Sequence, residues 1–118
     1  MDIIKQISFE INIPTSGFSG AIEKELPTEV RKAFAVAISS TNGDLLHYRG
    51  KVRLNLGNTN IINDGEDAKN YMDKFDFGNL DLNTTDRRLR FSYYDMPTPN
   101  TVFPSGGYTV KVVIHYKQ

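Results

Sequence analysis

The sequence predicts an all-β fold: an antiparallel, jelly-roll-like β-sandwich with one short inserted helix. The first observation is that residues 108–116 alternate between apolar or aromatic side chains and mostly polar ones, which is the period of a strand with one buried face. The second is that residues 3–13 and 87–95 alternate in the same way. The third is that clusters of Pro, Gly, Asn and Asp separate such runs and mark turns.

The number of predicted strands leaves the topology open. About five to eight strands fit the pattern, and both a jelly roll and an immunoglobulin-like sandwich are compatible with that number. The strand order does not follow from the pattern. The 118 residues contain no internal repeat, linker or low-complexity tract, so we expect one domain over residues 1–118.

The first strand is predicted over residues 3–13, and Pro14 ends it. Its apolar side chains fall on one face: Ile7, Phe9, Ile11 and Ile13. Residues 15–20 have the composition of a turn. Residues 21–26 are short and mixed, and the pattern assigns them no structure.

Residues 28–39 fit both a helix and a strand. A helical face would hold Val30, Phe34, Ala37 and Ile38, and a strand face would hold Phe34, Val36 and Ile38. We favour the strand because Asn42-Gly43 follows, the pair that best supplies the positive φ angles of a tight hairpin turn. The second arm of this hairpin is expected to start at Leu45, with a bulge or crossing point at Gly50.

The inserted helix is predicted within residues 64–75, as about two to three turns. Its apolar residues recur at spacings of three and four: Ala68, Tyr71, Met72 and Phe75. Residues 77–82 are expected to add an edge strand, and residues 83–86 a turn. Residues 96–107 contain three of the five prolines and form the longest irregular connection.

The composition excludes several classes of protein. The chain has no cysteine, which rules out a disulfide-rich scaffold and a thiolate metal site. Its 14 Lys and Arg balance its 14 Asp and Glu, so no overall field attracts it to nucleic acid or an anionic membrane. Residues 1–11 lack the basic start and apolar core of a signal peptide, so we expect synthesis in the cytoplasm and no membrane insertion.

The sequence does not predict an enzyme, a cofactor or a metal. It contains no nucleophile elbow, Walker loop, zinc-binding helix or dinucleotide fingerprint. His47 and His115 are expected to be ordinary strand residues, because a catalytic role would need an oriented partner. Asp64, Glu66 and Asp67 lack the ligand ladder of a calcium loop, so we interpret them as acidic residues that favour the start of the helix.

The longest stretches outside the predicted strands are the candidate contact surfaces for partners. In residues 96–107 the candidates are Asn100, Val102 and Phe103. A core-plugging role fits Phe103 equally well. In residues 58–75 the candidates are Ile61 and Ile62.

Arg88 and Arg90 are the other candidate contact residues. They lie beside Tyr93 and Tyr94 in the most basic and aromatic stretch of the chain, which makes a contact with nucleic acid or an anionic sugar conceivable. We favour a simpler interpretation, since outward Arg and Lys side chains commonly protect strands against edge-to-edge aggregation.

The segment L-N-L-G-N-T-N-I-I-N-D-G-E-D-A, residues 54–68, leads into the predicted helix. In this and in its overall pattern the chain resembles small jelly-roll structural proteins of bacteriophage capsids, of the vertex (penton) or decoration type. The resemblance implies a non-enzymatic virion component that assembles symmetrically. Its partners would be other copies of the chain and other structural proteins, and neither nucleic acid nor a small-molecule substrate.

The alternative function is a carbohydrate- or protein-binding β-sandwich module, similar to adhesins or lectins. A secreted adhesin normally carries a signal peptide. This chain shows none, so we rank this alternative second. An enzyme on a cupin-like barrel ranks third, because two isolated histidines are a poor supply of metal ligands.

Overall fold

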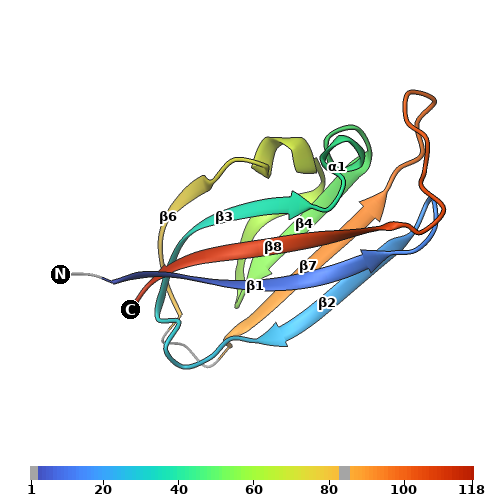
Figure 1. Ribbon diagram of the computed structural model, residues 1–118. Coiled ribbons are helices and arrows are strands. Elements are labelled where there is room, and N and C mark those ends of the chain that lie inside the picture. Colours follow the sequence, from blue (N-terminus) through green and yellow to red (C-terminus); the bar gives the residue numbers. More distant parts are fainter. Residues whose placement is uncertain (1–2, 83–85) are drawn as a thin grey trace.

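The computed structural model describes residues 3–82 and 86–118. Within these residues, eight strands form two four-stranded antiparallel sheets that face each other as a sandwich (Figure 1). The strands are β1 (Ile4–Ile13), β2 (Ser19–Glu25), β3 (Lys32–Ser40), β4 (Gly50–Leu56), β5 (Thr59–Asp67), β6 (Phe75–Asp81), β7 (Arg88–Asp95) and β8 (Tyr108–Lys117). The helical elements are α1 (Gly43–Arg49) and the 3-10 turn η1 (Ala68–Tyr71).

The strand order is that of a jelly roll. One sheet has the order β1-β8-β3-β6, and the other has the order β2-β7-β4-β5. The chain therefore changes sheet at every connection except the one between β4 and β5, which pair as neighbours. The predicted all-β sandwich is confirmed, and this order answers the topology question that the sequence left open.

The core lies between the two sheets. The predicted alternation of β8 is confirmed, because five of its side chains are buried: Tyr108, Val110, Val112, Ile114 and Tyr116. They meet inward side chains of the opposite sheet, among them Leu54, Leu89 and Phe91. Each fully buried side chain of this kind stabilises the fold by about 1.5–3 kcal/mol.

The hairpin predicted at Asn42-Gly43 is wrong. Asn42 is instead the N-cap of α1, and its side-chain oxygen accepts a hydrogen bond from the Leu45 N–H at 3.2 Å. Leu45 and Leu46, predicted to open a strand, are buried residues of α1. Consequently β3 and β4 lie in different sheets, and α1 carries the chain between them.

Gly50, expected as a bulge or crossing point within a strand, is instead the C-cap of α1 and the first residue of β4. A Cβ atom at this position would lie 2.7 Å from the Ala68 Cβ and 2.9 Å from the Leu46 carbonyl oxygen. Only glycine allows α1, η1 and β4 to approach this closely.

The helix predicted within residues 64–75 is shorter than expected. It is the single 3-10 turn η1, because β5 extends to Asp67 and β6 begins at Phe75. Two of the residues whose spacing suggested a helix, Ala68 and Tyr71, are buried. The helical spacing thus reflects a single turn that places Ala68 and Tyr71 in the core.

The strand preferred for residues 28–39 is confirmed as β3, but Phe34 is not on the predicted face. The register of β3 shifts between Ala33 and Ala35. Phe34 therefore packs against the outward His115, with ring centroids 6.2 Å apart, while Val36 and Ile38 join the core.

The remaining expectations concern edges and connections. The strand predicted at residues 77–82 is the edge strand β6, and most of the turn expected at residues 83–86 lies outside the described residues. Residues 96–107 form an irregular loop that projects from one end of the sandwich (Figure 1). No helix in the described part of the chain is long and apolar enough to cross a membrane.

Candidate interaction surface

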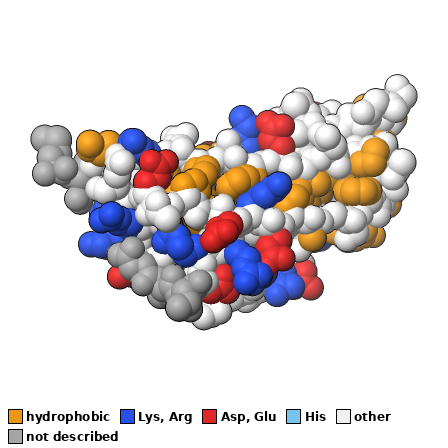
Figure 2. Space-filling view, turned by 90° about the horizontal axis from the view of Figure 1, so that it is seen from below, with side chains coloured by type: hydrophobic (Ala, Val, Ile, Leu, Met, Phe, Trp, Pro, Cys, Tyr) orange, Lys and Arg blue, Asp and Glu red, His pale blue; other side chains and the backbone are white. Residues whose placement is uncertain are grey.

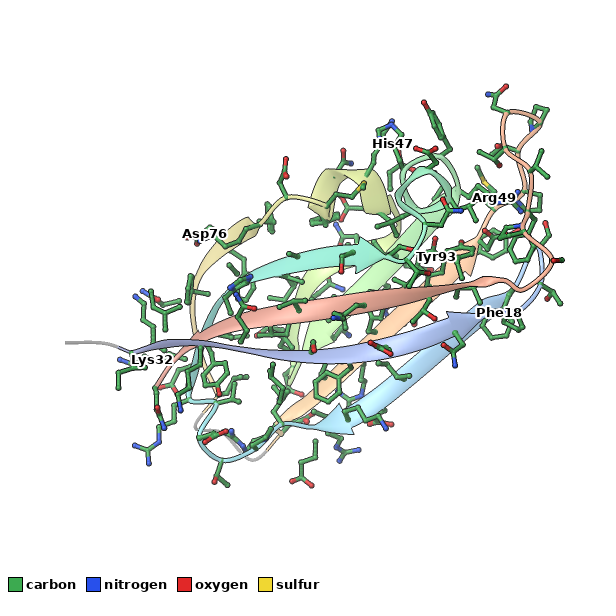
Figure 3. All side chains as sticks on the ribbon, viewed as in Figure 1. Phe18, Lys32, His47, Arg49, Asp76 and Tyr93 are labelled. Carbon is green, nitrogen blue, oxygen red and sulfur yellow. The ribbon has the colours of Figure 1, made fainter. Side chains whose placement is uncertain are left out.

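A buried ion pair holds the end of the sandwich from which the loop 96–107 projects. Arg49 is the last residue of α1, and Asp95 is the last residue of β7. The Arg49 Nε donates to Asp95 Oδ1 at 2.9 Å, and Nη2 donates to Oδ2 at 2.7 Å. The two residues are 2% and 0% exposed, so this bidentate pair lies in the protein interior. Figure 3 shows Arg49 and Tyr93 at this end of the molecule.

The remaining polar atoms of the pair are also satisfied. Asp95 accepts further hydrogen bonds from the Tyr108 hydroxyl at 2.6 Å and from the Gly17 N–H at 2.9 Å. The Arg49 guanidinium donates to Ser16 Oγ at 2.6 Å and to Thr101 Oγ1 at 3.1 Å. The pair therefore connects α1 and β7 with the β1–β2 turn and the loop 96–107.

The surroundings shift the pKa values of three groups. Burial alone would raise the pKa of Asp95, but the hydrogen bonds from Arg49, Tyr108 and Gly17 outweigh it and lower this pKa below 3.8. Burial raises the pKa of Tyr93 to about 12. Burial and the hydrogen bond to the Asp95 carboxylate raise the pKa of Tyr108 still further. Near neutral pH the site therefore holds one carboxylate, one guanidinium and two neutral phenols.

The base of the loop 96–107 is fixed to this network. The Met96 N–H donates to the Arg49 carbonyl oxygen at 2.9 Å. The Phe103 ring lies under the Arg49 guanidinium, 5.4 Å from centroid to Cζ, and 5.8 Å from the Tyr108 ring. Of the two roles considered for Phe103, packing against the core is the one that the geometry supports.

Beyond this base, the loop exposes an apolar tip. Val102 is 91% exposed, and Asn100 is also exposed. A shallow hollow of about 240 Å³ separates the loop from α1. Its lining includes Tyr48, which is 55% exposed. We call Tyr48, Asn100, Thr101 and Val102 the tip surface.

The other predicted contact residues lie away from the tip surface. Ile61 of β5 is half-buried and packs against the core. Ile62 is fully buried, so its side chain is out of reach of a partner of the folded chain. Arg88 and Arg90 point outward from β7, where both bind Glu23 at 3.0 and 3.1 Å.

The two histidines belong to different elements of the fold. His47 belongs to α1, not to a strand as expected, and its ring stacks edge-on against Tyr48 at 4.6 Å. His115 belongs to β8, and burial together with the charge of Lys74 lowers its pKa.

The three acidic residues around Gly65 lie in β5, and two of them, Glu66 and Asp67, have separate partners. Glu66 accepts hydrogen bonds from the Tyr71 hydroxyl at 3.0 Å and from the Asn63 N–H at 2.9 Å. Asp67 forms an ion pair with Lys51. In residues 3–82 and 86–118, no group of three or more His, Asp or Glu side chains is placed to hold a metal ion.

The outer face of the β2-β7-β4-β5 sheet carries two adjoining shallow hollows of about 450 and 380 Å³. Ser92 lines both of them. The rest of the lining mixes apolar residues with polar and charged ones, among them Lys51, Asp64, Arg53 and Tyr94. The first lies beside β5 and the second beside β2.

The buried ion pair was not predicted, although the sequence carries a signal for it. Leu89, Phe91 and Tyr93 are the inward positions of β7, and the next inward position is Asp95. A carboxylate on an inward face requires a cation or several donors. Its partner Arg49 could not be found, because the segment around it was assigned to a strand.

Comparison of the sequence with models of known protein families finds no match, and comparison with curated proteins finds no similar sequence.

Proposed function

We propose that the chain is a non-enzymatic structural protein that acts through subunit contacts. The observation that carries this proposal is Val102, which is 91% exposed on a loop whose base is fixed by the buried Arg49–Asp95 pair. An apolar side chain that is exposed and already positioned loses little conformational freedom when a partner covers it. The tip surface therefore fits a protein contact better than it fits a chemical reaction.

We propose further that the assembly is a virion, with the chain as a vertex, penton or decoration protein. Two observations support this. The jelly-roll order of the strands is widespread among viral capsid proteins, and the overall pattern of the sequence, including residues 54–68, led us to expect a resemblance to small structural proteins of bacteriophages. Fold alone does not specify function, so the proposal depends on contacts that can be measured.

The experiment is light scattering on the purified chain across a series of protein and salt concentrations. We expect a discrete symmetric oligomer whose population rises with protein concentration. At about 1 mM, a contact with a binding free energy of only about 4 kcal/mol would already be half-formed. A chain that remains monomeric up to this concentration would overturn the proposal.

A second candidate function is a carbohydrate-binding module, and the hollows on the outer β2-β7-β4-β5 face favour it. Tyr94 is 39% exposed beside polar side chains, and an aromatic ring with neighbouring donors and acceptors can bind a sugar. A glycan array probed with the purified chain tests this candidate. Specific glycan binding that is lost in Tyr94→Ala would support this candidate. Failure to bind any glycan would exclude binding to the glycans that the array contains.

A further inference from the structure

The β1 strand is an open edge of its sheet. Its ten residues pair with β8 on one side, and no described residue pairs with it on the other. The register from Ile4 opposite Lys117 to Ile13 opposite Tyr108 runs without a bulge. Such a regular edge presents a continuous row of unpaired backbone groups.

The register shows which backbone groups are free. The Gln118 N–H donates to the Ile3 carbonyl oxygen at 2.9 Å, and the two residues stand opposite each other if the β1–β8 register is extended by one position. In an antiparallel ladder such hydrogen-bonded pairs alternate with non-hydrogen-bonded pairs. The odd-numbered residues of β1 therefore bond to β8. The outward N–H and C=O groups belong to the even-numbered residues: Ile4, Gln6, Ser8, Glu10 and Asn12.

The other three edges in the described part of the chain are protected, and β1 is not. The β5 and β6 edges carry register shifts and glycines with positive φ, Gly65 and Gly78. The β2 edge is three residues shorter than β1, with 7 against 10, and ends in the charged run Glu23 to Glu25. In contrast, the middle of β1 has no proline, bulge or lysine.

An apolar stripe accompanies the open edge. Figure 2 shows a row of apolar side chains along the side of the molecule where β1 and β2 lie. The half-buried apolar residues of these strands and of the turn between them are Ile7, Phe9, Phe18 and Ile22. A further strand beside β1 would cover part of this stripe and bind the free backbone groups at the same time.

We propose that β1 pairs antiparallel with β1 of a second copy of this chain. This inference rests on the proposed function, because both require the chain to associate with itself. The partner is a second copy because β1 is complementary to itself. With a two-fold axis at Phe9, Ile7 lies opposite the second Ile11, and Ser8 lies opposite the second Glu10. Near the axis apolar positions then meet apolar positions, Lys5 lies opposite the second Ile13, and no like charges lie directly opposite each other.

The same rule restricts the register. An axis at Glu10 would place two carboxylates directly opposite each other, and an axis between two residues would exchange the buried and exposed faces. The axis at Phe9 pairs nine residues of each copy, from Lys5 to Ile13. The two copies form a closed dimer, since a two-fold contact uses the same patch on both subunits.

The first test is amide hydrogen exchange, followed by NMR at low and high protein concentration. The amides of Gln6, Ser8 and Glu10 should exchange at least tenfold more slowly in the associated state. The amides of Ile7 and Phe9, which bond to β8, should be protected at both concentrations and serve as the internal control. Outward amides that remain unprotected while the chain is associated would overturn β1 pairing and leave the proposed function standing.

The second test is a pair of proline variants studied by light scattering. Ser8→Pro removes an outward N–H and no hydrogen bond to β8, so the chain should fold and lose the two-fold contact. Ala21→Pro is the matched control on β2. The Asp95 N–H donates to the Phe18 carbonyl oxygen, so the even residues of β2 bond to β7 and Ala21 points its N–H outward.

Ala21→Pro should keep the wild-type mass. Equal masses for Ser8→Pro and wild type, or equal losses in both proline variants, would overturn the inference. If Ser8→Pro does not fold, the exchange pattern of the wild-type chain decides. A wild-type chain that is monomeric at every concentration would overturn the proposed function together with the inference.

Discussion

Arg49 and Asp95 are 46 residues apart in the chain and are joined by hydrogen bonds of 2.9 and 2.7 Å inside the sandwich. This pair ties the end of α1 to the end of β7 and fixes the base of the loop that carries Val102. Both groups are removed from water, so the loss of one partner would leave the other charge buried and uncompensated.

Arg49→Met should lower the free energy of unfolding by about 3–5 kcal/mol, because the Asp95 carboxylate would lose its cation. Equilibrium urea denaturation measures this loss. The control is Arg88→Ala, which removes a solvent-exposed pair with Glu23 and should shift the urea midpoint far less. Equal shifts in the two variants would show that the buried pair does not hold the fold together.

The stability of the chain should fall in acid. The pKa of Asp95 is lower in the folded chain than its ordinary value of 3.8, so its contribution is fully present above that value. It is lost as the pH falls through the lowered pKa. Thermal unfolding between about pH 5 and pH 2 measures this. Salt at about 0.5 M should weaken surface pairs but not the buried pair, so the acid loss should persist in salt. A melting temperature that is independent of pH would contradict this prediction.

The stability should also fall in alkali. The pKa of Tyr93 is raised to about 12 from 10.0, and that of Tyr108 is raised as well. A raised pKa gives stability that is fully present below about pH 10 and is lost as the pH rises through the folded value. Tyr93 and Tyr108 should therefore ionise only as the chain unfolds. Above about pH 10, their tyrosinate absorbance should rise together with the loss of the folded circular dichroism signal. If all six tyrosines ionised near pH 10 in a chain that stays folded, the burial of this pair would be wrong.

Gly107→Ala should destabilise the chain by about 2 kcal/mol or more. Gly107 has a φ of 72°, and a Cβ atom there would collide with the Ile13 carbonyl oxygen. The neighbouring Gly106 provides the control, since a Cβ atom at that position meets no atom within 4 Å. Gly106→Ala should stay within about 0.5 kcal/mol of wild type. Urea denaturation of both variants distinguishes strain at one position from a general sensitivity of the loop.

Strands with a clean period of two were predictable from the sequence. In β1, β7 and β8 the buried side chains alternate as the residue types do, because one face meets the core and the other meets water. The single extra residue at Phe34 was not predictable, since a bulge depends on the partner strands and leaves no mark in the pattern.

The segment around Asn42 failed for a different reason. Asparagine favours both tight turns and helix N-caps, so the same residue type supports two local structures. Packing against the core favours the helix, because Leu45 and Leu46 are both buried when this segment is helical. The same error hid Arg49, and with it the anchor of the tip surface. Of the predicted contact residues, Asn100 and Val102 do lie in that surface.

The proposed assembly depends most directly on the contact proposed for Val102, and one pair of variants tests it. Val102→Asp places a charge on the tip surface, and Ser105→Asp places the same charge at another exposed position of the same loop. Light scattering should show that Val102→Asp is reduced to a dimer, because the β1 contact is separate from the loop. Ser105→Asp should keep the mass of the wild-type oligomer. A Val102→Asp variant that folds and associates as the wild type does would contradict the account.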